Sequence, residues 1–348
     1  MSEARRRSLV VTAALVAAAC STPDSREDTT TAATFPPLTT VSSGTDSTTT
    51  DTATGSTMTA PDGTADTTAA NDDDAPKFDL GVQPDSLIPE DTGCRKVDFL
   101  FAIDNSGSMS AQQTQLLNSF PGFISAIQAS LQDTVDSYHV GVVSSDNYGY
   151  NQAGCTSIGD LVTQTGGFQA AGQNCLPFAE GLRFATEQDD LGVKFPCVAQ
   201  IGTSGSPIEQ PVTATIAALS DAKAAPGACN EGFLRDDAIL VVVVVTDDPP
   251  YDPDFDDAHP GTNTAGWYDA VVQAKNGDPT AMVVIGFVPW SNVSCVVFGI
   301  ESPNLIGFVQ SFGAQGVLAS VCEPDFGPIF AQTVQTIVST CENFDPPG

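Results

Sequence analysis

One segment limits the possible fold of this chain more than any other. Residues 238–245 are apolar throughout and end in five consecutive valines. β-branched residues favour strands, and a strand that is apolar at every position belongs in the middle of a parallel sheet with both faces buried. Residues 97–103 form a second short, mostly apolar run. The two runs predict inner strands of an α/β domain in which helices cover both faces of the sheet.

Each of these predicted strands is followed by acidic residues. Asp104 begins the sequence Asp104-Asn-Ser106-Gly-Ser108, and the second run is followed by Thr246-Asp247-Asp248. The carboxyl ends of parallel strands lie at one edge of the sheet, where doubly wound folds bind their ligands. The every-second-residue spacing of Asp104, Ser106 and Ser108 lets one tight loop direct a carboxylate and two hydroxyls at a common point. Hard divalent cations such as Mg²⁺ prefer oxygen ligands of this kind.

At these residues the chain resembles the von Willebrand factor type A domain, over about residues 94–342. In that family a metal-ion-dependent adhesion site combines an Asp-x-Ser-x-Ser loop with a Thr on a later loop and an Asp after a later strand. Asp104, Ser106 and Ser108 match the loop, and Asp247 matches the later Asp. The resemblance implies a bound Mg²⁺, Mn²⁺ or Ca²⁺ whose coordination is completed by an acidic side chain of a protein partner.

The position of the family's Thr is less clear in this chain. The family segment usually reads Gly-Thr-x-apolar-Gly-x-Ala-Leu, and the best match is Gly205-Ser206-Pro-Ile-Glu-Gln-Pro-Val. This match implies that Ser206 is the ligand, with Thr203 and Ser204 as nearby alternatives. Asp248 stands where the family commonly has Gly, which adds negative charge beside the site.

The first twenty residues have the pattern of an export signal. Arg5-Arg-Arg7 is followed by a short apolar stretch and then by Ala-Ala-Ala-Cys20. Cysteine after small residues resembles the bacterial lipoprotein box, which implies that Cys20 is lipidated and becomes the mature N-terminus. We therefore expect an exported, membrane-anchored lipoprotein at the outer membrane or the cell surface. The alternative is an ordinary secretory signal with an incidental cysteine.

Composition divides the rest of the chain into a tether and a domain. Residues 21–91 are mostly Thr, Ser, Asp, Ala, Gly and Pro, a composition that predicts a disordered acidic tether. Residues 92–348 have the length of one α/β domain, with an insertion around residues 145–202 that is rich in Gly, Gln and Asn. The formal net charge of −31 argues against a nucleic-acid partner, because phosphate binding requires clustered Lys and Arg.

The cysteines predict a domain that is stapled by disulfides. Nine are present, and all except Cys20 lie in the predicted domain: Cys94, Cys155, Cys175, Cys197, Cys229, Cys295, Cys322 and Cys341. An even set in an exported chain indicates disulfides, and the absence of Cys-x-x-Cys argues against a zinc or redox site. Cys94 and Cys341 bracket the domain, and several von Willebrand A domains join their ends in this way, so this pair is our best candidate.

The apolar patterns predict a doubly wound, mostly parallel α/β sheet with helices on both faces, as in Rossmann-like folds. Ser110-Ala-Gln-Gln113 reads as a capping box that opens the first helix. We expect strands at 97–103, 138–144, 238–245, 281–288 and 316–320, and helices after residue 110 and at 209–222, 267–275, 304–312 and 326–338.

The function that these features favour is a membrane-tethered binding or adhesion module and not an enzyme. One alternative is a structural or assembly subunit of the cell envelope, in which the metal only stabilises the fold. An extracellular hydrolase is a weaker alternative, because the chain lacks a Gly-x-Ser-x-Gly motif and has two histidines. We expect Asp248 and the acidic residues from Asp252 to Asp257 to form a negative rim, which would favour partners with an isolated acid amid neutral or basic residues.

Overall fold

The computed structural model describes residues 94–131, 135–250 and 256–347. The predicted export signal, Cys20 and the predicted tether lie outside the described residues.

In the described part of the chain, six strands form one sheet in the order β3-β2-β1-β4-β5-β6. Every neighbouring pair is parallel except β2 and β3. This is the strand order of a doubly wound fold, and it confirms the predicted fold class. The strands are β1 (Lys96–Ile103), β2 (Ser137–Ser144), β3 (Ala185–Thr186), β4 (Ile239–Val245), β5 (Met282–Val288) and β6 (Gly316–Ser320).

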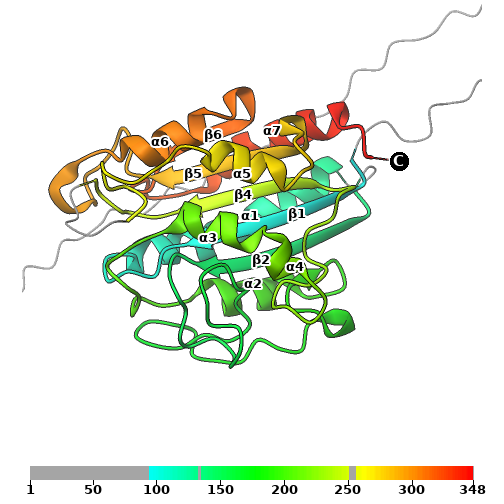
Figure 1. Cartoon of the computed structure of the whole chain (residues 1–348), viewed down its shortest axis with the longest axis horizontal. Coiled ribbons are helices and arrows are strands. Elements are labelled where there is room, and N and C mark those ends of the chain that lie inside the picture. Colours follow the sequence, from blue (N-terminus) through cyan, green and yellow to red (C-terminus); the bar gives the residue numbers. More distant parts are fainter. Residues whose placement is uncertain (1–93, 132–134, 251–255, 348) are drawn as a thin grey trace, which may run out of the picture. The chain divides into compact units, whose positions relative to one another are not determined.

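Helices cover both faces of this sheet (Figure 1). One face packs against α1 (Ser110–Leu131), α2 (Leu191–Ala199) and α7 (Gly327–Asn343). The other packs against α3 (Pro211–Ala218), α5 (Trp267–Gln273) and α6 (Pro303–Gln310), with the short α4 (Asp221–Ala224) next to α3. Short 3₁₀ helices lie at Ala179–Gly181, Pro279–Ala281, Val297–Gly299 and Gly313–Gln315.

Strand β4 shows why the valine-rich run belongs at the centre of the sheet. All of its residues are buried. Val241, Val243 and Val245 belong to the core under α1 and α7, whereas Val242 and Val244 belong to the core under α3 and α5. Because successive side chains of a strand point to opposite faces, a strand between two helical layers must be apolar at every position.

Four disulfides staple the domain: Cys94–Cys341, Cys155–Cys229, Cys175–Cys197 and Cys295–Cys322. They include all eight cysteines of the predicted domain, and they indicate an oxidising, extracytoplasmic location. Two of them anchor the predicted insertion, which contains β3 and α2. Within the described residues, no helix combines the length and the apolar character needed to cross a membrane.

The helix predicted at 209–222 begins later and is divided in two. α3 starts at Pro211, whose fixed φ and missing N–H suit the first helical position. Asp257 accepts hydrogen bonds from the backbone N–H groups of Val212 and Thr213 at 2.7 and 3.0 Å, which satisfies two of the free donors of this helix end. Glu209 therefore lies in the loop before the helix.

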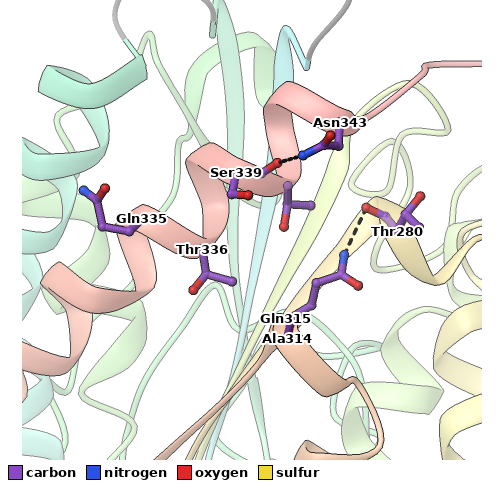
Figure 2. Close-up of a pocket in the computed structure, with 8 residues that line it drawn as sticks. Thr280, Ala314, Gln315, Gln335, Thr336, Ser339 and Asn343 are labelled. Carbon is purple, nitrogen blue, oxygen red and sulfur yellow. Dashed lines mark hydrogen bonds between the residues drawn. The ribbon is translucent and has the colours of Figure 1, made fainter.

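A cavity of about 450 Å³ lies between α7 and the segments that precede β5 and β6. Figure 2 shows Thr336 and Ser339 of α7 on one side of it and Gln315 and Thr280 on the other, with the side chain of Gln335 directed away from them. Hydroxyl and amide groups provide its polar lining, and the cavity lies toward the edge where the parallel strands begin. The acidic residues that follow β1 and β4 lie at the opposite edge, where the strands end.

Candidate metal centre

The candidate centre lies between the carboxyl ends of β1 and β4, where the strand order changes direction. Ile103 pairs with Val245 on one side and with Ser144 on the other, so three strand ends meet here. The backbone N–H of Asp104 donates to the carbonyl of Val245 at 2.9 Å, which holds the first residue of the loop against β4.

Asp104 is fully buried, and its carboxylate is held by neighbouring donors. The N–H of Ser106 donates to Oδ1 at 2.7 Å, and the hydroxyl of Thr246 donates to Oδ2 at 2.8 Å. The hydroxyl of Ser145 lies 3.5 Å from Oδ1. These contacts from three loops fix the direction of the carboxylate.

The two predicted serines and Asp247 lie together beside Asp104. The hydroxyls of Ser106 and Ser108 are 3.2 Å apart, and the hydroxyl of Ser108 donates to Oδ1 of Asp247 at 2.8 Å. Asp247 is 2% exposed, and its Oδ2 is buried without a hydrogen-bond partner. A buried carboxylate oxygen without a donor is costly, and a cation placed beside it would remove that cost.

Glu209 is the third acidic residue of the centre. One carboxylate oxygen from each of Asp104, Glu209 and Asp247 lies within 4.8 Å of the other two, and all three residues are buried. Oε2 of Glu209 also has no hydrogen-bond partner. In the family segment matched above, Glu209 occupies the second Gly position, and this acidic replacement was the signal that could have identified it.

The electrostatics of this group favour a bound cation. Burial raises the pKa of Asp247 to about 7, and the nearby negative charge of Asp104 acts in the same direction. Burial also raises the pKa of Glu209, with further upward contributions from Asp104 and Asp248. Burial raises the pKa of Asp104 as well, against the lowering effect of its hydrogen bonds. Three buried carboxylates this close repel one another when ionised, and an oxygen-preferring divalent cation would compensate their charge.

The three candidates for the ligand of the second loop differ in their contacts. The backbone N–H of Ser206 donates to Asp146 at 2.8 Å, and its hydroxyl accepts the N–H of Ile208 at 3.0 Å. The Thr203 hydroxyl donates to the side chain of Gln169, and the Ser204 hydroxyl accepts the N–H of Phe168. Thr203 and Ser204 therefore contact the insertion, and the assignment of Ser206 to the metal stays a prediction.

Close backbone packing joins the second loop to the first. The N–H of Gly205 donates to the carbonyl of Asn105 at 2.8 Å. A Cβ at position 205 would lie 2.2 Å from Oδ1 of Asn105, so the Asn105 side chain or the loop backbone would have to shift. Gly205 therefore permits this contact because it has no side chain.

Gln113 has a different role from the capping-box residue that the sequence suggested. Its amide nitrogen donates to the carbonyls of Asp104 and Gly202 at 2.9 and 2.8 Å, and its Oε1 accepts the N–H of Gly202. This buried side chain connects α1 to both loops of the centre, and it is a positioning residue that the sequence did not identify.

The prediction of an exposed acidic rim is wrong for the residues that the structure describes. Asp248, Asp256 and Asp257 are at most 1% exposed. Asp257 accepts hydrogen bonds from the start of α3, and Asp248 lies near the N–H of Ala258 at 3.4 Å. These carboxylates point into the protein because they satisfy backbone donors there. Asp252 and Asp254 lie outside the described residues.

The histidine in β2 is far from the candidate centre along the strand. Nδ1 of His139 lies 2.7 Å from the carbonyl oxygen of Phe233, and the residue pairs in the sheet with Asp98, near the start of β1. The structure therefore does not bring His139 to Ser106 or Ser108.

No protein-family model matches this chain, and a comparison with curated proteins finds no similar sequence.

Proposed function

We propose that this chain is an exported binding module of the von Willebrand A type, which engages a protein partner through a divalent cation. The observation that carries the proposal is the buried group of Asp104, Glu209 and Asp247 at the switch point of a doubly wound sheet, with two carboxylate oxygens that lack donors. Doubly wound sheets bind ligands at this position.

The donor set fits Mg²⁺, Mn²⁺ or Ca²⁺, because it consists of oxygen atoms. Asp104, Glu209 and Asp247 would contribute carboxylates, and Ser106, Ser108 and Ser206 would contribute hydroxyls. When bound, the ion supplies positive charge that attracts an acidic side chain of the partner. The protein residues hold the ion, fix the direction of its ligands and keep the group largely shielded from water.

The geometry of the domain suits presentation from a membrane anchor. Cys94 forms a disulfide with Cys341, near the end of α7. This bond lies at the edge of the sheet where β1 begins. The candidate metal centre lies at the other edge. We propose that lipid on Cys20 anchors the chain and that the metal-binding edge is available to partners. Intact-mass analysis of the mature chain tests the lipid, and Cys20→Ala should release the chain from membranes.

Titration calorimetry on the mature chain tests the metal centre. We expect binding of Mg²⁺, Mn²⁺ or Ca²⁺, with Asp104→Ala abolishing it. Glu342→Gln is the matched control, because this exposed residue near the end of α7 should leave the affinity unchanged. Equal ion binding by the wild type and Asp104→Ala would exclude this centre.

The structural or assembly role remains a second candidate, because Glu209 adds a third carboxylate to the group. Three carboxylates neutralise more of the ion's charge than two and leave less attraction for a partner's acid. Capture from envelope extracts separates the two roles. In the binding role, chelator and Asp104→Ala each abolish capture. In the structural role, capture survives both treatments while the melting temperature falls.

A further inference from the structure

A groove lies between α1 and α2, beside the strands β2 and β3. Its volume is about 370 Å³, within the range of about 300–1,000 Å³ that is usual for ligand sites. Apolar side chains from both helices form its floor: Phe120, Pro121 and Ile124 come from α1, and Leu191 and Pro196 come from α2. We call this feature the α1–α2 groove.

The floor of the α1–α2 groove is firmly packed from below. Phe120 is 2% exposed, and its ring stacks on the ring of Phe195 in α2 with the two centroids 3.4 Å apart. Phe195 in turn contacts Phe101 of β1 in an edge-on arrangement. These ring contacts join α1, α2 and the sheet, so the floor keeps its shape without a partner. A groove that is formed in advance needs little reordering when a ligand binds.

Three acidic residues, Glu187, Asp189 and Asp190, border this apolar floor. Backbone groups fix the directions of their carboxylates. The N–H of Tyr138 donates to Glu187 at 3.2 Å, and the N–H of Gly192 donates to Asp190 at 3.0 Å. Such donors carry no net charge, so the carboxylates stay negative. Among the described residues that line the groove there is no lysine, arginine or histidine to neutralise them.

Tyr138 and a backbone carbonyl add to the negative character of the groove. Burial raises the pKa of Tyr138, and the charges of Glu187 and Asp189 act in the same direction, so the three side chains share one environment. Aromatic rings and carboxylates both attract cations. Pro196 has no N–H and cannot donate the helical hydrogen bond to the carbonyl of Gly192, which also lines the groove. The α1–α2 groove therefore combines hydrogen-bond acceptors and negative charge with an apolar floor.

We infer that the α1–α2 groove docks a partner protein through a Lys or Arg that stands next to a large apolar residue in the partner. The cation pairs with the carboxylates, and the floor buries the apolar residue together with the hydrocarbon part of the cationic side chain. Because the floor extends over two helices, it suits two adjacent side chains of a protein segment better than one small amine.

This docking surface is separate from the candidate metal centre. Tyr138 pairs with Val97 near the start of β1, whereas the metal centre lies beyond Ile103 at the end of that strand. The inference therefore does not rest on the proposed function, and docking should proceed in the presence of chelator.

Selection from a random peptide library displayed on phage tests the inference. The immobilised full chain is panned in chelator, and bound phage are eluted with concentrated salt, which screens charge pairs. We expect enriched peptides to carry Lys or Arg next to Leu, Ile, Val, Phe or Trp. Glu187→Gln keeps an acceptor for the N–H of Tyr138 but removes a charge, and it should weaken binding of these peptides by about tenfold. Ser125→Lys places a cation at the groove and should weaken binding as well.

Two matched controls separate the groove from the general acidity of the chain. Glu231 is exposed and also accepts a backbone N–H, from Gly227 at 2.8 Å, but it does not line the groove. Glu231→Gln changes the net charge as Glu187→Gln does and should leave peptide binding unchanged. Ser130→Lys adds a cation at another exposed position of α1 and should also have no effect. Melting curves verify that each variant is folded.

Four results would overturn the inference. The first is that no peptide is enriched, and the second is that basic peptides are enriched without an apolar neighbour. The third is an equal loss of binding in Glu187→Gln and Glu231→Gln, which would show attraction to the net charge of −31 and not to the groove. The fourth is that spermidine binds as tightly as the peptides and with the same dependence on Glu187, which would assign the groove to a small amine. None of these results bears on ion binding, so the proposed function is tested separately.

Discussion

The hydroxyl of Ser108 donates a hydrogen bond of 2.8 Å to the carboxylate of Asp247, which lies 139 residues later in the chain. This contact joins the loop after β1 to the loop after β4 across the switch point of the sheet. It places a neutral hydroxyl and a carboxylate where one cation can reach both. The same pair of residues provides the most direct test of how the two loops cooperate.

Ser108→Ala should weaken ion binding by about tenfold or more, since partners that orient metal ligands typically contribute this much. The substitution removes one proposed hydroxyl ligand and the hydrogen bond that this hydroxyl donates to the Asp247 side chain. Calorimetry measures the effect. Ser108→Thr retains the hydroxyl and should keep most of the affinity, whereas equal loss in both variants would point to a packing defect.

Glu209→Gln should have opposite effects on the metal-free and the metal-bound protein. Without metal, the substitution removes one of three buried carboxylates and should raise the melting temperature. With metal, it removes a charged ligand and should lower both the ion affinity and the stabilisation that saturating ion provides. Melting curves in chelator and in Ca²⁺ measure both effects. A shift of the same sign in the two conditions would contradict a ligand role for Glu209.

Gly205→Ala should weaken ion binding, because the new Cβ would lie 2.2 Å from Oδ1 of Asn105 and displace that side chain from its contacts with Ser145 and Asp146 beside the centre. The matched control is Gly122→Ala in α1, where a Cβ meets no atom within 4 Å and the helix gains a better helix former. Calorimetry and melting curves on both variants separate loop displacement from a general loss of stability. Normal ion affinity in Gly205→Ala would show that the contact with Asn105 is dispensable.

The free energy of unfolding should decrease as the pH falls, because His139 is harder to protonate in the folded protein than in the unfolded chain. Burial lowers the pKa of His139 to about 4, and the positive charge of Arg235 acts in the same direction. Between that value and the ordinary value near 6.5, the unfolded chain binds a proton that the folded protein excludes. The contribution of the neutral imidazole is therefore lost progressively as the pH falls through this window.

Urea unfolding of the wild type and His139→Gln over this pH range checks the effect of the imidazole. The difference in unfolding free energy between the two proteins should shift in favour of the variant toward acidic pH. A difference that is independent of pH would show that His139 does not titrate in this window. Ion binding should be unaffected by the substitution, because His139 lies near the N-terminal ends of β1 and β2, away from the candidate centre at the carboxyl ends.

Replacing both Cys94 and Cys341 by Ser should destabilise the domain by about 2–5 kcal/mol, the usual range for a native disulfide of a small secreted domain. The bond joins residues 247 apart, and the unfolded chain therefore loses much freedom when it is closed. Denaturant unfolding measures the change. Ion affinity should be retained because the disulfide lies at the edge opposite to the metal centre, and a parallel loss of affinity would show long-range coupling.

The class of fold and two of the acidic residues of the centre follow from local patterns. A strand that is apolar throughout must lie between two layers, so residues 238–245 alone indicate a covered parallel sheet. Because parallel strands end at a common edge, the sequence predicts that the residues after β1 and β4 are neighbours. Asp104 and Asp247 are indeed neighbours, because β1 and β4 are adjacent and parallel and place them there independently of the loop conformations.

Only the tertiary structure decided which other groups enter the centre. Glu209 reaches it because α3 begins at Pro211 and is capped by Asp257, a residue distant in sequence. The sequence predicts a local capping contact for Gln113, but its side-chain amide donates hydrogen bonds to backbone carbonyls of two separate loops. Asp248 and Asp257 turn inward toward backbone donors that no local pattern reveals. Strand periodicity is a property of the nearby sequence, whereas the direction of a loop side chain depends on partners that folding brings from elsewhere in the chain.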